Sequence, residues 1–239
     1  MTQQLILDLP AAPAPTLSGY VVGGNAAALD ALKQLQPGRA LYLWGPSGSG
    51  RSHLLQALCA QSSAGQGSYL NAASPLHDYT ELTQGDTPLS GLVAIDDVHL
   101  LDESRQAALF TLYNLWREAA GGASAFPLLL AGDQSPLGMP LREDLRTRLG
   151  WDLVIRLEQL SDEDRATAMA GQAHQRGLRL GPEVINWILT HYSRDMGQLS
   201  ALIDALDRYS LARHRAITIP LLKELLASQA PAPSHSDLA

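Results

Sequence analysis

The hydrophobic pattern of this chain alternates between short apolar runs and longer stretches in which apolar residues recur every three or four positions. Short apolar runs are typical of strands buried on both faces of a parallel sheet, and the longer stretches are typical of amphipathic helices. Strands that alternate with helices predict an α/β domain, because each helix covers one face of the sheet. The expected strands lie at 40–44, 67–71, 92–97, 126–131 and 151–158.

From Ser161 onward the pattern becomes purely helical. The run SDEDR offers a capping serine with acids in the first turn, which is a typical helix start. We expect helices at 162–175, 182–191, 196–213 and 220–226, which together form a small all-α domain. The expected division is a peptide and linker at 1–17, the α/β domain at 18–159, the helical domain at 160–227 and a disordered, Pro-rich tail at 228–239.

Composition excludes several classes of function. The 17 basic residues against 24 acidic ones give a net charge of −7, so we expect little direct DNA binding. Because Cys59 is the single cysteine, no internal disulfide can form, and a reducing cytoplasm is the expected compartment. We find no secretory signal and no apolar run long enough to cross a bilayer, so no membrane partner is expected. The histidines lack the spacing of a metal site.

The segment GPSGSGRS, residues 45–52, joins the first expected strand to an amphipathic helix. It fits the phosphate-loop pattern G-x-x-x-x-G-K-[ST] except that Arg51 replaces the lysine. The glycines allow several backbone N–H groups to converge on an anion, and the helix start adds its positive dipole end. A Gly/Ser-rich turn is the alternative. The residues expected to bind nucleotide phosphates are Gly45, Pro46, Ser47, Gly48, Ser49, Gly50, Arg51, Ser52 and His53.

Two side chains of this loop predict the cofactor and its use. Ser52 can place its hydroxyl on a Mg²⁺ ion that bridges the phosphates of ADP or ATP. Arg51 has a planar guanidinium group, whereas the usual lysine has a compact ammonium group. Arginine can therefore bind phosphate oxygens, but its charge does not occupy the position that lysine takes between the phosphates. We therefore expect binding to survive better than catalysis, with weak intrinsic ATP hydrolysis.

Carboxylates follow two of the expected strands. Asp96 and Asp97 end the run LVAIDD, and Asp133 follows the apolar run at 126–131. Ligands bind at the carboxyl edge of a parallel sheet, so these acids are expected near the phosphate loop. A solvated turn or a helix cap is the alternative for the paired aspartates.

The N-terminal segment MTQQLILDLP precedes a Pro/Ala stretch that can act as a tether. Leu5, Leu7 and Leu9 alternate with other residues. From this alternation alone, an edge strand and an exposed docking peptide remain equally open.

The order of these features resembles the AAA+ nucleotide-switch proteins, and within them the DnaA-homologous family, including its shorter Hda-type regulatory inactivators. The resemblance implies an AAA+ P-loop NTPase fold with a parallel five-stranded sheet flanked by helices, followed by a small all-α lid domain. It assigns Asp96 to the magnesium shell, Asp97 to the orientation of water and Asp133 to the sensor 1 position. In the segment YVVGGN it places Val21 and Val22 against the adenine.

The same resemblance implies the partners. Gln4, Leu5, Leu7 and Leu9 are similar to the motif Q-L-x-L-x-L that binds the DNA polymerase III sliding clamp (β subunit). The segment RLGWDLVIRL resembles the box that carries the arginine finger, which gives Arg148 that role. A family member of this kind, bound to ADP and docked on the DNA-loaded clamp, stimulates ATP hydrolysis by the initiator DnaA and so represses initiation. Nucleotide-dependent self-association is also implied.

Two features distinguish members within the group. The chain ends after the expected lid, so the DNA-binding domain of the initiator is not expected. In the lid, Gly197 stands where the family carries a sensor 2 arginine, and Arg194 lies one helical turn earlier as a candidate for nucleotide contact.

The sequence has to be weighed against two alternative functions. A small-molecule kinase would share the phosphate loop but needs an acceptor site, of which the sequence shows no sign. A helicase loader or DNA-binding replication adaptor should carry a basic stripe. The basic residues late in the chain, Arg208, Arg213 and Arg215, are interspersed with acids and indicate a solvated face instead.

Overall fold

The computed structural model describes residues 14–62, 67–84, 89 and 91–229. The proposed clamp peptide, with Gln4, Leu5, Leu7 and Leu9, therefore lies outside the described residues, as does most of the predicted tail. The chain divides into two compact units, an α/β unit that ends at Leu160 and a helical unit that begins at Ser161.

The described part of the α/β unit contains one parallel sheet with the strand order β2-β3-β4-β1-β5. This five-stranded sheet and its flanking helices confirm the predicted fold class. The strands are β1 Ala40–Trp44, β2 Ser68–Leu70, β3 Val93–Ile95, β4 Leu128–Gly132 and β5 Leu153–Arg156. β1 has the predicted bounds, and β4 starts two residues later and ends one residue later than its predicted run. β2, β3 and β5 are shorter than predicted, because residues at both ends of their runs leave the ladder.

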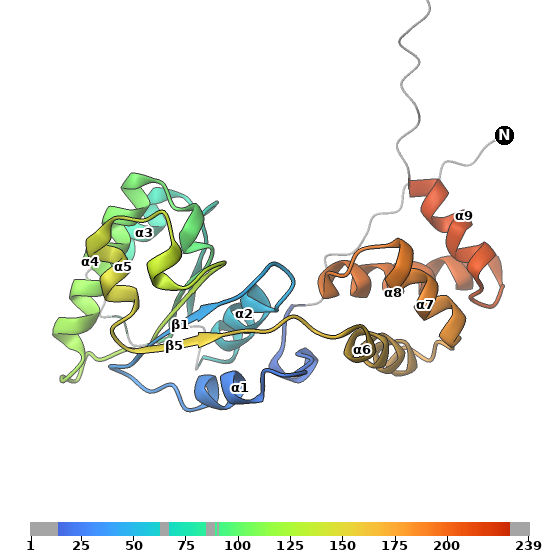
Figure 1. Ribbon diagram of the computed structural model, residues 1–239, viewed down its shortest axis with the longest axis horizontal. Coiled ribbons are helices and arrows are strands. Elements are labelled where there is room, and N and C mark those ends of the chain that lie inside the picture. Colours follow the sequence, from blue (N-terminus) through green and yellow to red (C-terminus); the bar gives the residue numbers. More distant parts are fainter. Residues whose placement is uncertain (1–13, 63–66, 85–88, 90, 230–239) are drawn as a thin grey trace, which may run out of the picture. The chain divides into compact units, whose positions relative to one another are not determined.

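Alternate strand residues point into two different cores, which produces three layers (Figure 1). Leu41 and Leu43 of β1 contribute to the core that contains α1 and α2, whereas Tyr42 contributes to the core that contains α3, α4 and α5. Both cores are almost wholly apolar, so each helix is held by burial of its hydrophobic stripe. The helix bounds are α1 Ala26–Lys33, α2 Arg51–Gln61, α3 Leu76–Gln84, α4 Glu103–Ala119 and α5 Glu143–Leu149.

The strand register places three chain segments at one edge of the sheet. Trp44 pairs with Gly132, and Ile95 pairs with Leu130, so β1, β3 and β4 end at similar heights. The chain continues from these ends into the phosphate loop, into Asp96 and into Asp133. Parallel pairing is thus what brings together residues that are far apart in the sequence.

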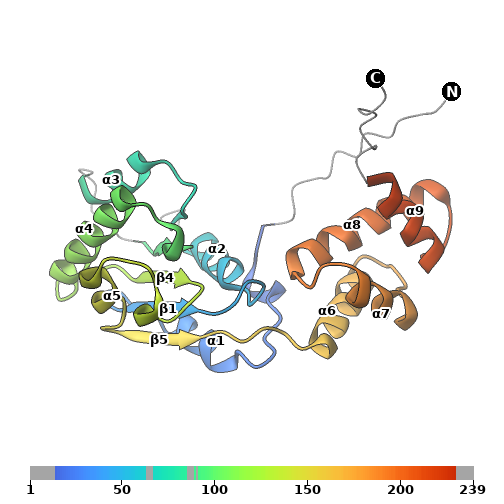
Figure 2. The same ribbon diagram turned by 45° about the horizontal axis from the view of Figure 1, so that its top comes forward.

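Within the described residues, the helical unit contains four helices around its own apolar core, and all of them are labelled in Figure 2. Ser161 caps the first of them with a complete capping box, in which its hydroxyl accepts from the Asp164 N–H and the Asp164 carboxylate accepts from the Ser161 N–H. The helices are α6 Asp162–Gln175, α7 Pro182–His191, α8 Met196–Arg213 and α9 Ile219–Gln229. Among the described residues, no helix combines the length and apolar character that crossing a membrane requires.

Candidate functional site

The loop between β1 and α2 has the backbone that an anion site requires. Gly48 and Gly50 adopt positive φ angles of 78° and 91°, in the left-handed region that glycine enters without strain. Helix α2 begins directly after Gly50, and no side chain in the described structure caps its first N–H groups. The Ser49 hydroxyl oxygen is buried and has no hydrogen-bond partner within the described chain. Unpaired donors at a helix start form a nest for a phosphate group.

Two glycines of the loop are also required by close packing. A Cβ atom on Gly45 would lie 2.5 Å from the backbone oxygen of Leu157, and one on Gly50 would lie 2.6 Å from the ring of Tyr20. Contacts this short do not occur for real side chains, so larger residues would displace the loop. The phosphate loop is thereby held between the chain segment after β5 and the aromatic ring of Tyr20.

Arg51, the departure from the phosphate-loop pattern, turns back onto the loop. Its Nη1 donates to the backbone oxygen of Gly45 at 2.6 Å, and its Nη2 lies 3.9 Å from Oδ1 of Asp97. The side chain is only 10% exposed. Its positive charge therefore lies at the phosphate loop, and at least one of its five N–H donors already binds the protein.

Asp96 is fully buried and held on both carboxylate oxygens. The Tyr69 hydroxyl donates to Oδ2 at 2.9 Å, and the Asp97 N–H donates to Oδ1 at 2.8 Å. These bonds fix the orientation of the carboxylate while each oxygen keeps a second lone pair. Asp96 is thus a rigid acid next to the phosphate loop.

Asp97 takes up a less common backbone conformation. Its φ of 50° is in the left-handed region, where aspartate is better tolerated than most residues. Burial and the neighbouring Asp96 charge raise the pKa of its carboxyl, while His99 and Arg51 act in the opposite direction. The turn places two acids and one arginine in a single electrostatic cluster.

Asp133 lies at the end of β4, as the sequence predicted. Its Oδ1 atom is 3.8 Å from Nδ1 of His99, which follows β3 in the short helix η3, Val98–Leu100. The charge of Asp133 also acts on Asp97 and on Tyr42, and it contributes to raising the pKa of both groups. The structure therefore brings Asp96, Asp97 and Asp133 to one sheet edge beside Arg51.

The segment YVVGGN runs beside the start of α2. The Tyr20 ring contacts the His53 ring, with 5.8 Å between their centres, and His53 Nε2 lies 2.8 Å from the backbone oxygen of Thr16. Val21 and Val22 are half-buried, and Val22 packs against the core of α1 and α2. The segment is therefore next to the phosphate loop, where a base contact would be needed.

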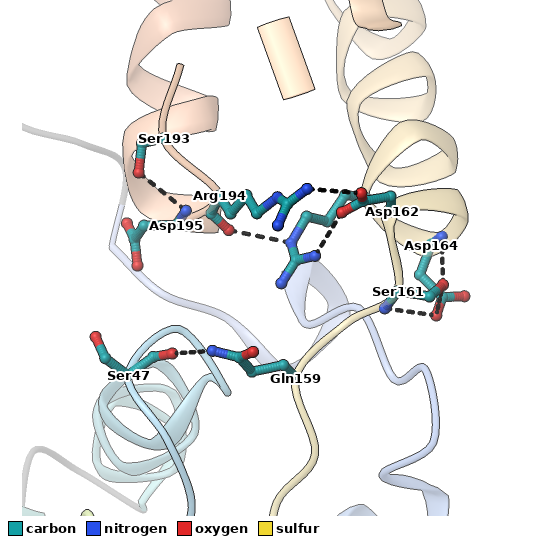
Figure 3. Close-up of polar contacts among 9 residues, drawn as sticks. Ser47, Gln159, Ser161, Asp162, Asp164, Ser193, Arg194 and Asp195 are labelled. Carbon is teal, nitrogen blue, oxygen red and sulfur yellow. Dashed lines mark hydrogen bonds and ion pairs between the residues drawn. The ribbon is translucent and has the colours of Figure 1, made fainter. Parts of the chain in front are cut away.

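Asn25 anchors this segment to the chain just after β5. Its side chain donates to the Glu158 backbone oxygen at 3.0 Å and accepts from the Glu158 N–H at 2.8 Å. It makes no capping bond to α1, although it occupies the position before that helix. A second link is Gln159, whose Nε2 donates to the Ser47 backbone oxygen at 2.7 Å (Figure 3).

Arg148 lies near the C-terminal end of α5 and is held against α4. Its guanidinium carbon is 3.7 Å from the centre of the Phe110 ring and 5.6 Å from that of Trp151. It also donates to the side-chain oxygen of Asn114. These contacts hold a planar cation on aromatic faces.

Arg194 belongs to the helical unit, where Asp162 binds two arginines. Arg194 Nη2 lies 3.0 Å from Oδ2 of Asp162 (Figure 3), and Arg165 Nη1 lies 2.9 Å from Oδ1. Arg165 is buried and also donates to the backbone oxygen of Arg194 at 3.1 Å. Arg194 is thus fixed at its backbone, while its side chain stays 63% exposed.

The residues present fit a nucleotide with magnesium. The nest and Arg51 suit phosphate oxygens, and the fixed carboxylate of Asp96 together with the exposed Ser52 suits the hydration shell of a magnesium ion. Within the described ranges, no group of three or more His, Cys, Asp or Glu side chains could hold a metal by itself. Any magnesium would therefore depend on the phosphates as well as on these residues.

A phosphate loop at the edge of this sheet, followed by a helical lid, defines the AAA+ class of P-loop folds. Residues 162–226 match the family model described as the lid domain of Hda. The helical unit is therefore similar to the lid domain of Hda. This agrees with the resemblance to the DnaA-homologous family that the sequence indicated.

Solved structures show the same fold. Domain III of the Thermotoga maritima replication initiation protein DnaA has a TM-score of 0.71 and 22% identity, over 91% of this chain and 98% of that one. AMPPCP-bound DnaA from Aquifex aeolicus has a TM-score of 0.61 and 22% identity, over 80% of this chain and 64% of that one. A RuvB mutant from Thermotoga maritima has a TM-score of 0.65 and 14% identity, over 89% of this chain and 71% of that one.

Sequence reasoning missed several residues that shape the site. Tyr20, Asn25 and Gln159 contact the loop or its neighbours through bonds that span the chain, and His99 reaches Asp133 from another strand end. The sequence signal for Tyr20 was its place in YVVGGN, directly before the valines that were singled out. Asn25 ends the same segment, whereas Gln159 and His99 carry no local pattern, because their partners are set by strand order.

Proposed function

We propose that this protein is a nucleotide-bound regulator of replication initiation, which docks on the DNA-loaded sliding clamp and stimulates ATP hydrolysis by the initiator DnaA. The observation that carries the proposal is the match to the Hda lid domain at residues 162–226, joined to an α/β unit with the fold of DnaA domain III. Hydrolysis would convert the active initiator into its inactive form. The protein thus represses a second round of initiation.

The nucleotide is ADP or ATP, held by the loop at 45–52. The DnaA of Aquifex aeolicus was solved with AMPPCP, which supports a nucleotide in the same fold. The N–H nest and Ser52 bind the β-phosphate, while Val21 and Val22 lie against the base. Magnesium, when bound with the nucleotide, neutralises phosphate charge.

Slow intrinsic hydrolysis follows from the same residues. Arg51 donates to the Gly45 backbone oxygen at 2.6 Å, so its guanidinium is oriented by the loop and does not place a compact charge between the β- and γ-phosphates as a lysine ammonium would. Asp97 and Asp133 remain available to orient water. ADP should therefore bind well, and ATP turnover without a partner should be slow.

Arg148 is the group that we assign to the initiator's nucleotide. An arginine supplied in trans neutralises charge in the transition state and accelerates phosphoryl hydrolysis by ~10³–10⁵. Its stacking on Phe110 and its bond to Asn114 would hold the guanidinium in a defined orientation until the partner arrives. Arg194 is a candidate contact to the protein's own nucleotide in place of the arginine missing at Gly197.

The contact with the clamp is assigned to Gln4, Leu5, Leu7 and Leu9. Their role rests on the sequence motif, because these residues lie outside the described part of the chain. A glutamine and spaced leucines on a tether fit an apolar pocket of a partner.

A reconstituted assay tests the proposal. ATP-loaded initiator is mixed with clamp-loaded DNA and with this protein preloaded with ADP, and the ATP that remains on the initiator is measured over time. We expect rapid loss of ATP only when the clamp, the DNA and this protein are all present. No acceleration would refute the proposal, and tight binding to clamp-free DNA would favour the helicase loader or DNA-binding adaptor instead.

A further inference from the structure

Two polar atoms face each other in the α/β unit without forming a hydrogen bond. Nδ1 of His99 and Oδ1 of Asp133 are 3.8 Å apart, and each atom is buried without a hydrogen-bond partner in the part of the chain that the structure describes. Buried polar atoms are nearly always paired in folded proteins, and the exceptions are often at functional sites. A shift of about 1 Å would bring these two atoms to ordinary hydrogen-bonding distance.

The local backbone is built to keep His99 at this position. Asp97, in its left-handed conformation, turns the chain from the end of β3 into η3. Val98, the first residue of η3, is fully buried, and a Cβ on Gly132 would lie 3.2 Å from its Cγ2 atom. Gly132 therefore lets η3 approach the end of β4. This close packing places the imidazole of His99, the residue after Val98, against Asp133.

The exposure of Asp133 is asymmetric. Its Oδ1 atom is buried against His99, yet the side chain as a whole is 37% exposed. The accessible surface of the side chain thus lies on atoms other than Oδ1. A hydrogen bond to Oδ1 would restrict rotation of the carboxylate and fix the direction of its second oxygen.

We propose that His99 is a positioning residue for Asp133. In this proposal, Nδ1–H of His99 donates to Oδ1 of Asp133 when a nucleoside triphosphate is bound, and the second oxygen then orients the water at the γ-phosphate. The inference rests on the proposed nucleotide site. Because a diphosphate has no γ-phosphate, His99 affects the triphosphate state and leaves ADP binding unchanged.

Two variants separate positioning from structural support. His99→Leu removes the donor but retains an apolar side chain of moderate size. His99→Asn keeps a donor, because the amide nitrogen of asparagine is attached at the same distance from Cβ as Nδ1 of histidine. His77→Leu on α3 is the matched control, since His77 also pairs with an aspartate, Asp78 at 2.7 Å, but is 77% exposed.

The experiment measures single-turnover hydrolysis of labelled ATP and calorimetric affinity for ADP in the full-length chain. For His99→Leu we expect roughly a tenfold slower hydrolysis, as for loss of one hydrogen bond to a charged group, with the ADP dissociation constant unchanged. His99→Asn should recover most of the rate, and His77→Leu should match the wild type. NMR of ¹⁵N-labelled histidine should show a shift of Nδ1 of His99 with AMPPCP but not with ADP.

The outcomes are distinguishable. His99→Leu with a wild-type rate, or no difference in the Nδ1 signal between AMPPCP and ADP, would overturn the inference. Equal losses of ATP hydrolysis and ADP affinity, without recovery in His99→Asn, would show a structural role and also overturn it. A chain that binds no nucleotide would refute both proposals. If the His99 variants behave as expected but the wild-type protein fails to stimulate ATP hydrolysis by the initiator, only the proposed function is refuted.

Discussion

Replacing Asn25 by alanine is expected to destabilise the α/β unit through two hydrogen bonds. The side chain is 4% exposed and links the segment before α1 to the Glu158 backbone by bonds of 3.0 Å and 2.8 Å. A hydrogen bond of this kind contributes about 1–1.5 kcal/mol, so Asn25→Ala should cost about 2–3 kcal/mol. For a chain of this size, that loss corresponds to a fall in melting temperature of about 4–12 °C.

The same change should weaken nucleotide binding. Val21 and Val22 lie in the segment that Asn25 anchors, and the Asn25 N–H bonds to the Val22 backbone oxygen at 2.8 Å. Without the anchor, this segment samples more conformations, and binding has to order it again. The dissociation constant of ADP should therefore rise in Asn25→Ala.

Thermal unfolding followed by tryptophan fluorescence, with and without ADP, measures both effects. Asn186→Ala is a suitable control, because Asn186 is exposed on α7 and its replacement should change stability by no more than about 0.5 kcal/mol. If Asn25→Ala has the same melting temperature and the same ADP affinity as the wild type, Asn25 does not anchor this segment.

Three other predictions concern separate parts of the chain. Deleting residues 1–10 should abolish clamp binding in a pull-down and leave the melting temperature nearly unchanged, whereas a large loss of stability would show an edge strand instead. The raised pKa of Asp97 means that the fold favours its protonated form, so stability falls as pH rises through that pKa. Asp97→Asn should therefore unfold at higher urea than the wild type at pH 7, and the difference should vanish below about pH 4; equal midpoints at pH 7 would contradict this. Burial raises the pKa of Cys59 to about 11, so iodoacetamide at pH 8 should label the unfolded chain and spare the folded one, as mass spectrometry can show.

The fold was largely predictable because its signals are local. Continuous apolar runs indicated the strands, and Ser161 with its following acids indicated the start of α6, where the capping box is present. Strand ends were less predictable: the run 92–97 contains only Val93–Ile95 as β3, because Asp96 and Asp97 form a turn with a left-handed residue. Hydrophobicity alone carries no information about that turn.

The site was predictable where a residue follows a motif and unpredictable where its role depends on a distant partner. Gly48 and Gly50 have the backbone that the phosphate-loop pattern requires. The contact of Arg51 with the Gly45 oxygen, and that of His99 with Asp133, depend on side-chain direction and strand order. Neither leaves a pattern in the sequence.

Above all, we propose that Arg148 acts on the nucleotide of the initiator. The most direct measurement is the rate of ATP hydrolysis by DnaA on clamp-loaded DNA, with ADP-loaded wild type, Arg148→Ala or Arg142→Ala. Arg142 is the matched control, because it lies just before α5 and its guanidinium carbon is 5.6 Å from the centre of the same Phe110 ring.

We expect Arg142→Ala to stimulate like the wild type, and Arg148→Ala to lose most of the stimulation, by ~10³-fold if it supplies a full arginine finger, while ADP affinity and clamp binding are retained. Equal stimulation by the two variants, or a loss in Arg148→Ala that follows a loss of ADP binding, would contradict the claim.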